Sequence, residues 1–181
     1  DAKFPVILSG AGVVIGDAIN ECKALAEKLD APVCNGYQHN DSFPGSHPLA
    51  VGPLGYNGSK AAMQLISKAD VVLALGTRLN PFSTLPGYGI DYWPKNANII
   101  QVDMNPDRIG LTKKVTVGIA GDAKQVAKQI FDKLSSNAGD SGREDRKNLI
   151  HQTKSAWLQT LTSLDHEDDD PGTVWNKEAR E

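Results

Sequence analysis

The stretch A-D-V-V-L-A-L-G-T-R-L-N-P at residues 69–81 decides the fold of this chain. Five apolar residues, Val71 to Leu75, follow one another without a polar interruption and stop at Gly76. This pattern is typical of a strand that is buried on both faces of a parallel sheet, and it predicts that the strand lies in the middle of its sheet. Because parallel sheets bind ligands beyond the carboxyl ends of their strands, the residues after Leu75 are expected at a binding site.

Arg78 is the first candidate for ligand contact at that place. Its planar guanidinium suits a phosphate or a carboxylate, and Gly76 would let the backbone approach the same ligand. An arginine in a salt bridge at a loop explains the same pattern, so both interpretations stand at this point.

Composition limits the classes of function. The chain has 181 residues, of which 40% are hydrophobic and 23% charged, and this size fits one domain with an appendage. The net charge of -3, without any basic run, argues against a nucleic-acid partner, and no apolar run is long enough to cross a membrane. The two cysteines, Cys22 and Cys34, are interpreted as buried thiols of a reducing compartment, and we expect a cytoplasmic protein. The first residue, Asp1, suggests that the chain was cut from a longer one.

The residues before the central strand alternate between strand and helix patterns. Residues 4–8 form an apolar run that ends in a glycine turn, and Asp17 is expected to cap the helix that follows. Residues 31–34 are predicted to form the second strand. The next segment, residues 35–58, is rich in Gly, Pro, Asn and His and is interpreted as a functional loop. Ser59 is expected to cap the next helix.

The alternation continues after the central strand. Residues 82–95 are predicted to form a loop, strands are predicted at 99–103 and 115–119, and Asp122 is expected to cap a helix that ends near residue 134. This order predicts an α/β domain over residues 1–137, doubly wound and Rossmann-like, with a mostly parallel sheet and helices on both faces. Residues 138–181 are interpreted as an amphipathic helix, 143–164, followed by a solvated acidic interdomain linker.

Few residues indicate chemistry directly. The segment from Gly10 to Gly16 has one residue too many for G-x-G-x-x-G, and Asn35 stands where a nicotinamide site would place an acidic residue. A nicotinamide dehydrogenase is therefore disfavoured. Asp103 could accept a ribose hydroxyl or could cap the turn that follows it. His39, Asp41 and His47 have no metal-binding frame and are interpreted as loop residues, and we predict neither a catalytic group nor a metal ligand.

Six segments, taken together, resemble the central domain of thiamine-diphosphate-dependent enzymes of the acetolactate synthase type. They occur in the family's order and cover residues 1–135: P-V-I-L-S-G-A-G at 5–12, A-P-V at 31–33, L-G-Y-N-G-S at 54–59, A-D-V-V-L-A-L-G-T-R-L at 69–79, I-I-Q-V-D-M-N-P-D-R-I-G at 99–110 and G-D-A at 121–123. Within the family, residues 36–44, 76–89 and 165–173 look most like the acyltransferases of taurine and sulfonate degradation. Those members convert sulfoacetaldehyde and phosphate to acetyl phosphate and sulfite.

The resemblance implies a scaffold role for this domain. In the family, thiamine diphosphate and magnesium are held by an amino-terminal and a carboxyl-terminal domain whose motifs this sequence does not contain. The resemblance therefore implies that the fragment is inactive alone, and that its partners are other domains of one polypeptide in a homodimer or homotetramer. The alternatives are the central domain of an acetolactate synthase-like enzyme and a free-standing nucleotide-binding module.

In relatives that carry FAD or ADP, the central domain contacts the nucleotide, which implies candidate binding positions here. An ADP-type nucleotide is the candidate ligand. FAD is not expected, because Asn80 and Pro81 replace the acidic pair of the flavin-carrying relatives. The positions that match are Gly10, Ala11, Gly12, Gly55, Tyr56, Asn57, Gly76, Arg78, Asp103 and Asp122.

Overall fold

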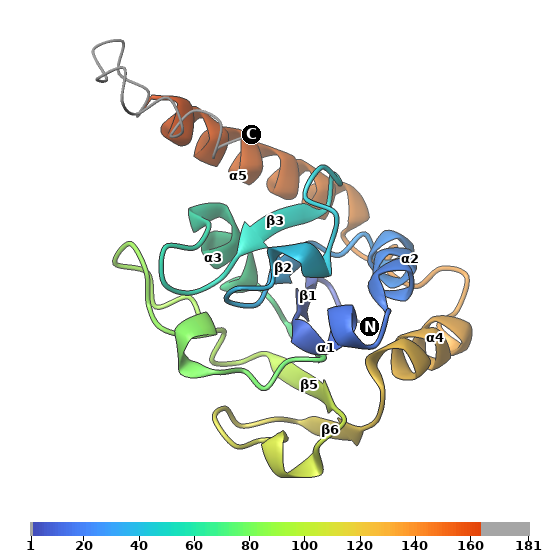
Figure 1. Ribbon diagram of the computed structural model, residues 1–181. Helices are drawn as coiled ribbons and strands as arrows, with labels where there is room; N and C mark the ends of the chain where they lie inside the picture. Colours follow the sequence, from blue (N-terminus) through green and yellow to red (C-terminus); the bar gives the residue numbers. More distant parts are fainter. Residues whose placement is uncertain (1, 164–181) are drawn as a thin grey trace.

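A computed structural model describes residues 2–163 of the chain, so the predicted acidic linker lies outside the described residues. The described part is built on one six-stranded sheet, ordered β3-β2-β1-β4-β5-β6, in which all strand pairs are parallel (Figure 1). The strands are β1 (Pro5–Ser9), β2 (Val33–Asn35), β3 (Ala50–Pro53), β4 (Val71–Leu75), β5 (Asn98–Asp103) and β6 (Val117–Ala120). The predicted doubly wound α/β class is confirmed.

Strand β4 is central, as the apolar run predicted. It pairs with β1 along its whole length, from Pro5 opposite Val71 to Ser9 opposite Leu75, and with β5 on its other side. The side chains of Val72, Ala74 and Leu75 are fully buried. The chain adds strands outward from β1 on one side and from β4 on the other, so the strand order reverses between β1 and β4 and the switch point of the sheet lies beside Gly76.

Helices cover both faces of the sheet. Helix α2 (Ile19–Leu29) packs against α4 (Ala123–Lys133), and α3 (Lys60–Ile66) packs against α5 (Arg143–Thr162). The crossovers through α2 and through α3 run in opposite directions along the sheet, so right-handed connections put the two pairs on opposite faces. Ser59 and Asp122 cap α3 and α4 by accepting hydrogen bonds from Ala62 N and Gln125 N, which confirms both expected caps.

Four local predictions were wrong. The second strand was predicted to begin at residue 31 and begins at Val33. The segment 35–58 is not all loop, because residues 50–53 form the edge strand β3. This strand pairs with β2 in an irregular register and contains Gly52 at a positive φ, so it lacks the alternation of apolar and polar residues that indicates a strand. Asp17 does not cap a helix. The first helix, α1 (Ala11–Ile15), starts directly after the glycine turn, and Ala18 is the N-cap of α2. The Asp17 carboxylate instead pairs with Lys124 at 2.8 Å. The last strand is two residues later at its start than predicted.

The long helix α5 packs on the Rossmann-like domain through both an apolar and a charged residue. Ile150 is buried in the common core, and Arg146, 1% exposed, reaches the end of α2 and the start of the chain. Part of the predicted appendage therefore contacts the domain. Within residues 2–163, no helix is long and apolar enough to cross a membrane.

Candidate functional site

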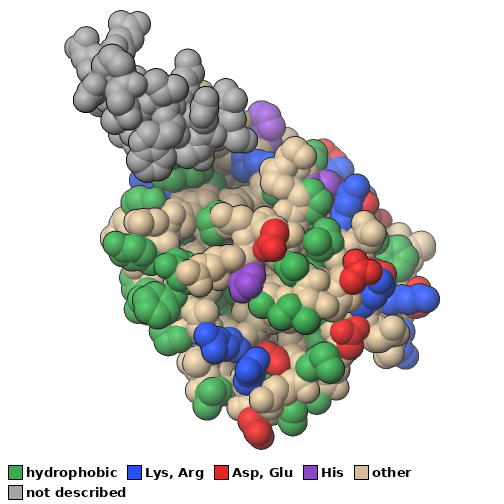
Figure 2. Space-filling view, viewed as in Figure 1, with side chains coloured by type: hydrophobic (Ala, Val, Ile, Leu, Met, Phe, Trp, Pro, Cys, Tyr) green, Lys and Arg blue, Asp and Glu red, His purple; other side chains and the backbone are tan. Residues whose placement is uncertain are grey.

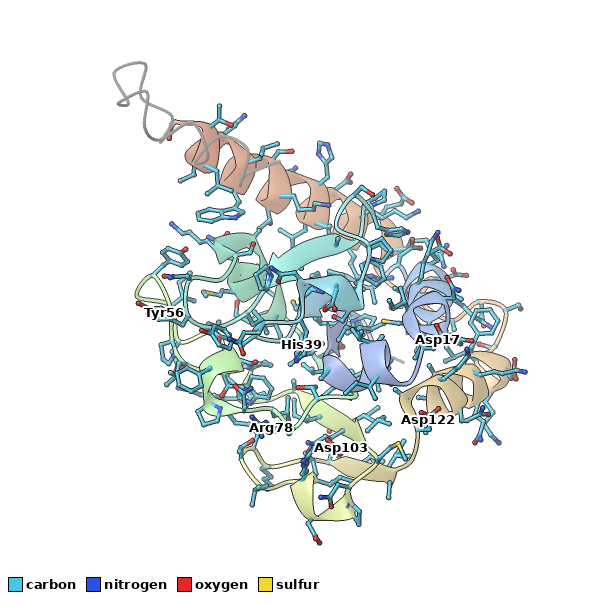
Figure 3. The ribbon with its side chains drawn as sticks, viewed as in Figure 1. Asp17, His39, Tyr56, Arg78, Asp103 and Asp122 are labelled. Atoms are coloured by element: carbon cyan, nitrogen blue, oxygen red, sulfur yellow. The ribbon has the colours of Figure 1, made fainter. Side chains whose placement is uncertain are left out.

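A cavity of about 440 Å³ lies at the carboxyl ends of the strands, where the sequence placed a site. It extends from the end of β2 across the switch point to the start of α4. Seven of the ten sequence-predicted residues line it: Gly10, Ala11, Gly12, Gly76, Arg78, Asp103 and Asp122. Figure 3 shows Arg78, Asp103 and Asp122 at this end of the sheet, with His39 nearby.

The three other predicted residues do not line this cavity. Gly55, Tyr56 and Asn57 form the turn after β3, where Tyr56 N–H donates to Phe82 O at 3.2 Å. The Tyr56 ring is 66% exposed and lies away from Arg78 in Figure 3. A Cβ at Gly55 would meet Phe82 O at 1.7 Å, so this glycine is required by contact between two loops rather than by a ligand in the cavity.

The glycines of the first turn are also required by packing within the chain. Gly76 has a φ of +60°, which favours glycine, and its Cα lies so close to the first turn that a Cβ on Gly12 would approach it to 2.7 Å. A Cβ on Gly10 would meet Thr77 Cβ at 2.6 Å. The glycine spacing that resembles a nucleotide-binding turn thus lets the β1–α1 turn lie directly on the β4 turn.

This contact also uses backbone donors that a phosphate would need. Gly10 N–H donates to Leu75 O at 3.1 Å and Gly12 N–H donates to Gly76 O at 2.8 Å. Because α1 is only five residues long, it adds little to anion binding. Recognition of an anion in this cavity therefore depends on side chains, and two arginines line it, Arg78 and Arg108.

Arg108 was missed by the sequence analysis. It ends the short turn of residues 106–108 after β5, and its side chain, like that of Arg78, is exposed. Within residues 2–163, neither guanidinium makes a salt bridge. The predicted alternative, Arg78 paired with a carboxylate, is therefore not seen in the described part of the chain. Figure 2 shows Lys or Arg side chains gathered on the lower part of the face in view, with a histidine above them.

A buried glutamine holds the loops that carry both arginines. The side chain of Gln101 in β5, 1% exposed, donates through Nε2 to Thr77 O at 3.1 Å and to Arg108 O at 3.2 Å, while its Oε1 accepts from Gly110 N at 2.8 Å. These three hydrogen bonds give both the nitrogen and the oxygen of the side-chain amide a partner, as a buried polar group requires. The signal in the sequence was a polar residue between the apolar Ile100 and Val102, in the interior of the strand.

The two aspartates of the cavity each have a structural bond. Asp103 Oδ1 accepts from Asn105 N at 2.9 Å, so it caps the turn, as one of its two interpretations proposed. Asp122 Oδ1 accepts from Gln125 N at 3.0 Å. Asp103 Oδ2 has no hydrogen bond to any other described residue, and it remains available to a ligand hydroxyl.

The loop after β2 closes one end of the cavity and is held by buried polar contacts. Asn35 Nδ2 donates to Ser42 Oγ at 3.0 Å and to His39 O at 3.2 Å, and Ser9 Oγ donates to Ser42 O at 3.1 Å. The ring of Tyr37 stacks on that of Phe82 at 5.6 Å. The His39 side chain lies 3.9 Å from Asp41, and in the described part of the chain no three His, Cys, Asp or Glu residues come together to hold a metal ion.

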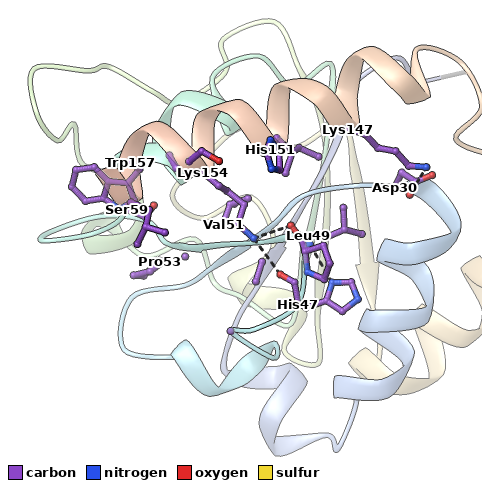
Figure 4. A pocket seen from close by; sticks show the side chains of 18 of the residues that line it. Asp30, His47, Leu49, Val51, Pro53, Ser59, Lys147, His151, Lys154 and Trp157 are labelled. Atoms are coloured by element: carbon purple, nitrogen blue, oxygen red, sulfur yellow. Dashed lines mark hydrogen bonds and ion pairs between the residues drawn. The ribbon is translucent and has the colours of Figure 1, made fainter. Parts of the chain in front are cut away.

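A second, larger cavity of about 880 Å³ separates α5 from the edge strand β3 (Figure 4). Its lining is mainly apolar and includes Leu49, Val51 and Trp157, and Lys154 crosses it to donate to His47 O and Pro48 O. Burial lowers the pKa of Lys154. None of the predicted site residues lines this cavity.

The two cysteines are both buried and free, as predicted. Burial raises the pKa of the Cys22 thiol to about 12 and also raises the pKa of the Cys34 thiol. Neither thiol has the depressed pKa or exposure of a reactive cysteine.

Comparison with known proteins places the whole fold region in one family. Residues 1–130 match the family described as "Thiamine pyrophosphate enzyme, central domain". The match covers every strand, helices α1 to α3 and the greater part of α4.

The chain is similar over its full length to proteins of one name. It is 80% identical over 181 residues to a probable sulfoacetaldehyde acetyltransferase of Rhizobium meliloti, covering 100% of this chain and 31% of that protein. It is 74% identical to a sulfoacetaldehyde acetyltransferase of Roseovarius nubinhibens, covering 99% and 30%. A probable acetolactate synthase large subunit of Methanocaldococcus jannaschii is 38% identical, covering 91% and 25%. The chain therefore spans less than a third of the length of these relatives.

Proposed function

Because this chain belongs to the family of thiamine pyrophosphate enzyme central domains, we propose that it is the central domain of a sulfoacetaldehyde acetyltransferase. The longer enzyme converts sulfoacetaldehyde and phosphate to acetyl phosphate and sulfite. One observation carries this proposal: identity of 70–80% over nearly the whole chain to proteins of that name, against 38% to an acetolactate synthase subunit.

The proposal assigns thiamine diphosphate and magnesium to other domains of the longer polypeptide. In residues 2–163, no three His, Cys, Asp or Glu residues come together to hold a metal ion. Thiamine diphosphate bound by those domains would supply the chemistry of substrate cleavage, and this domain would contribute a scaffold to which the other domains attach. We further propose that the enzyme is a cytoplasmic homodimer or homotetramer; its two free, buried thiols suit a reducing compartment.

The test uses both the long enzyme and this chain. The enzyme encoded by the complete reading frame should release sulfite from sulfoacetaldehyde only when phosphate, thiamine diphosphate and magnesium are all present. It should form little acetolactate from pyruvate. If acetolactate is the main product, the enzyme is the acetolactate synthase-like alternative. The 181-residue chain alone should give no saturable heat when titrated with thiamine diphosphate and magnesium, and micromolar binding would contradict the scaffold role.

We propose in addition that the cavity at the switch point binds an ADP-type nucleotide and not FAD. A pocket of about 440 Å³ has the size of a small-ligand site, and Arg78 and Asp103 supply a cation for phosphate and an oxygen for a ribose hydroxyl. A charged hydrogen bond contributes about 1.5–3 kcal/mol, so Arg78→Ala should weaken ADP binding by about ten-fold to a hundred-fold. Absence of a thermal shift with millimolar ADP would refute the proposal, and a yellow protein would refute the exclusion of FAD.

A further inference from the structure

Arg78 and Arg108 both line the switch-point cavity, on loops that follow the neighbouring strands β4 and β5. Two positive charges that line one cavity favour an anion within it. Neither makes a salt bridge within residues 2–163, and the carboxylates of Asp103 and Asp122, which line the same cavity, accept backbone hydrogen bonds instead. The cavity thus offers a ligand two guanidinium groups that have no salt-bridge partner among residues 2–163.

The backbone beneath both arginines is fixed. Gln101 bonds to Thr77 O on one loop and to Arg108 O on the other, and it is buried. Thr112 adds a second link, because its Oγ1 donates to Leu79 O at 2.6 Å and to Arg78 O at 3.3 Å. The two cationic side chains therefore project from a braced pair of loops, and little backbone entropy is lost when an anion binds.

A diphosphate that lies over the switch point is expected beside Arg78. The switch point lies at Gly76, beside Arg78, whereas Arg108 lies five residues after Asp103, the candidate acceptor for a ribose hydroxyl. In dinucleotide sites, an arginine beside the ribose accommodates a phosphate on the sugar. We propose that the ligand is an adenine nucleotide with an additional phosphate on its ribose, an inference that rests on the proposed nucleotide site. Arg108 binds this phosphate, and Asp103 accepts a hydrogen bond from the remaining ribose hydroxyl.

Calorimetric titration of the 181-residue chain with three probes tests this proposal: ADP, 3′-phospho-ADP and 2′-phospho-ADP. One of the two phosphorylated probes should bind about ten-fold to a hundred-fold more tightly than ADP, from the charge-assisted bonds to Arg108. Which one it is identifies the ribose hydroxyl that carries the phosphate. Because Arg108 is exposed, Arg108→Gln should fold normally; it should remove this gain and leave the affinity for ADP unchanged.

Three variants separate the outcomes. Arg78→Gln should weaken all three probes, and Arg108→Lys should recover part of the gain because it keeps the charge without the fork. Lys114→Gln, which removes an exposed cation outside the cavity, should change none of the affinities. If ADP binds and neither phosphorylated probe binds more tightly, the inference fails and the ADP site stands. If Arg108→Gln weakens ADP as much as Arg78→Gln does, both arginines bind the diphosphate and the inference fails. If no probe binds, the nucleotide site itself is refuted.

Discussion

Replacing Arg146 with alanine should destabilise the protein more than any other single change on α5. The guanidinium is 1% exposed, and it donates to five backbone carbonyls, those of Lys3, Leu29, Asp30, Gly139 and Ser141, four of them at 2.8–2.9 Å. Among residues 2–163, no carboxylate forms a salt bridge with this guanidinium. Burial lowers its pKa. It therefore joins the start of β1, the end of α2 and the turn before α5 through carbonyl oxygens alone.

The size of the effect follows from two opposing quantities. Each hydrogen bond from a charged donor contributes about 1.5–3 kcal/mol, so five would far exceed the stability of a domain if they simply added. Burying the charge costs several kcal/mol in return, and measured losses on breaking such buried networks are about 3–5 kcal/mol. With a urea dependence of about 2 kcal/mol per molar, Arg146→Ala should lower the unfolding midpoint by about 2 M.

Urea unfolding followed by circular dichroism measures this, with Arg143→Ala as the matched control. Arg143 lies one turn earlier, is 33% exposed and pairs with Asp30 and Asp140, so its loss should cost less than about 1 kcal/mol. Arg146→Lys should fall between the two variants, because an ammonium group keeps three donors. Hydrogen exchange should show that the amides of α5 lose protection in Arg146→Ala before those of β4. The reasoning is refuted if Arg146→Ala and Arg143→Ala have the same free energy of unfolding.

Three further results are expected. Gly12→Ala should lower the melting temperature strongly, because the new Cβ would lie 2.7 Å from Gly76 Cα. Gly45→Ala is the control and should leave the melting temperature unchanged, because the space around Gly45 is open. Equal melting temperatures of the two variants would contradict the packing role of the turn. Burial raises the pKa of Cys22 from 9.0 to about 12, and that of Cys34 rises too, so these thiols contribute stability below about pH 9 that is lost as the pH rises toward 12. Denaturation across this range should show a shallower loss in Cys22→Ala/Cys34→Ala than in the unmodified chain. Lys124 lowers the pKa of the exposed Asp17 carboxyl, and an NMR titration of Lys124→Ala should show that pKa return upward with no change in the fold.

The sequence was sufficient for features that depend on local patterns. The uninterrupted run from Val71 to Leu75 predicted a central strand, and Ser59 and Asp122 were recognisable as helix caps, because burial on two faces and capping each leave a short, regular signature. Strand β3 left no such signature. Its four residues include Gly52 with a φ of +91° and end at Pro53, so neither alternation nor β-propensity indicates a strand, and only pairing with β2 makes it one.

The candidate site was predictable in position and only in part in its chemistry. Parallel sheets form sites at the carboxyl ends of their strands, which made Arg78 a candidate. Arg108 lines the same cavity from a loop that Gln101 joins to the Arg78 loop, by donating to both Thr77 O and Arg108 O. That link joins residues 24 apart in the sequence, and periodicity cannot reveal it. The glycines admit two explanations, since a turn that packs on a neighbouring backbone and a turn that admits a phosphate need glycine for the same steric reason. The hydrogen bonds favour the first explanation here: the Gly10 and Gly12 N–H groups donate to the carbonyls of Leu75 and Gly76 and are not free for an anion. The arginines are then the source of positive charge that the cavity offers.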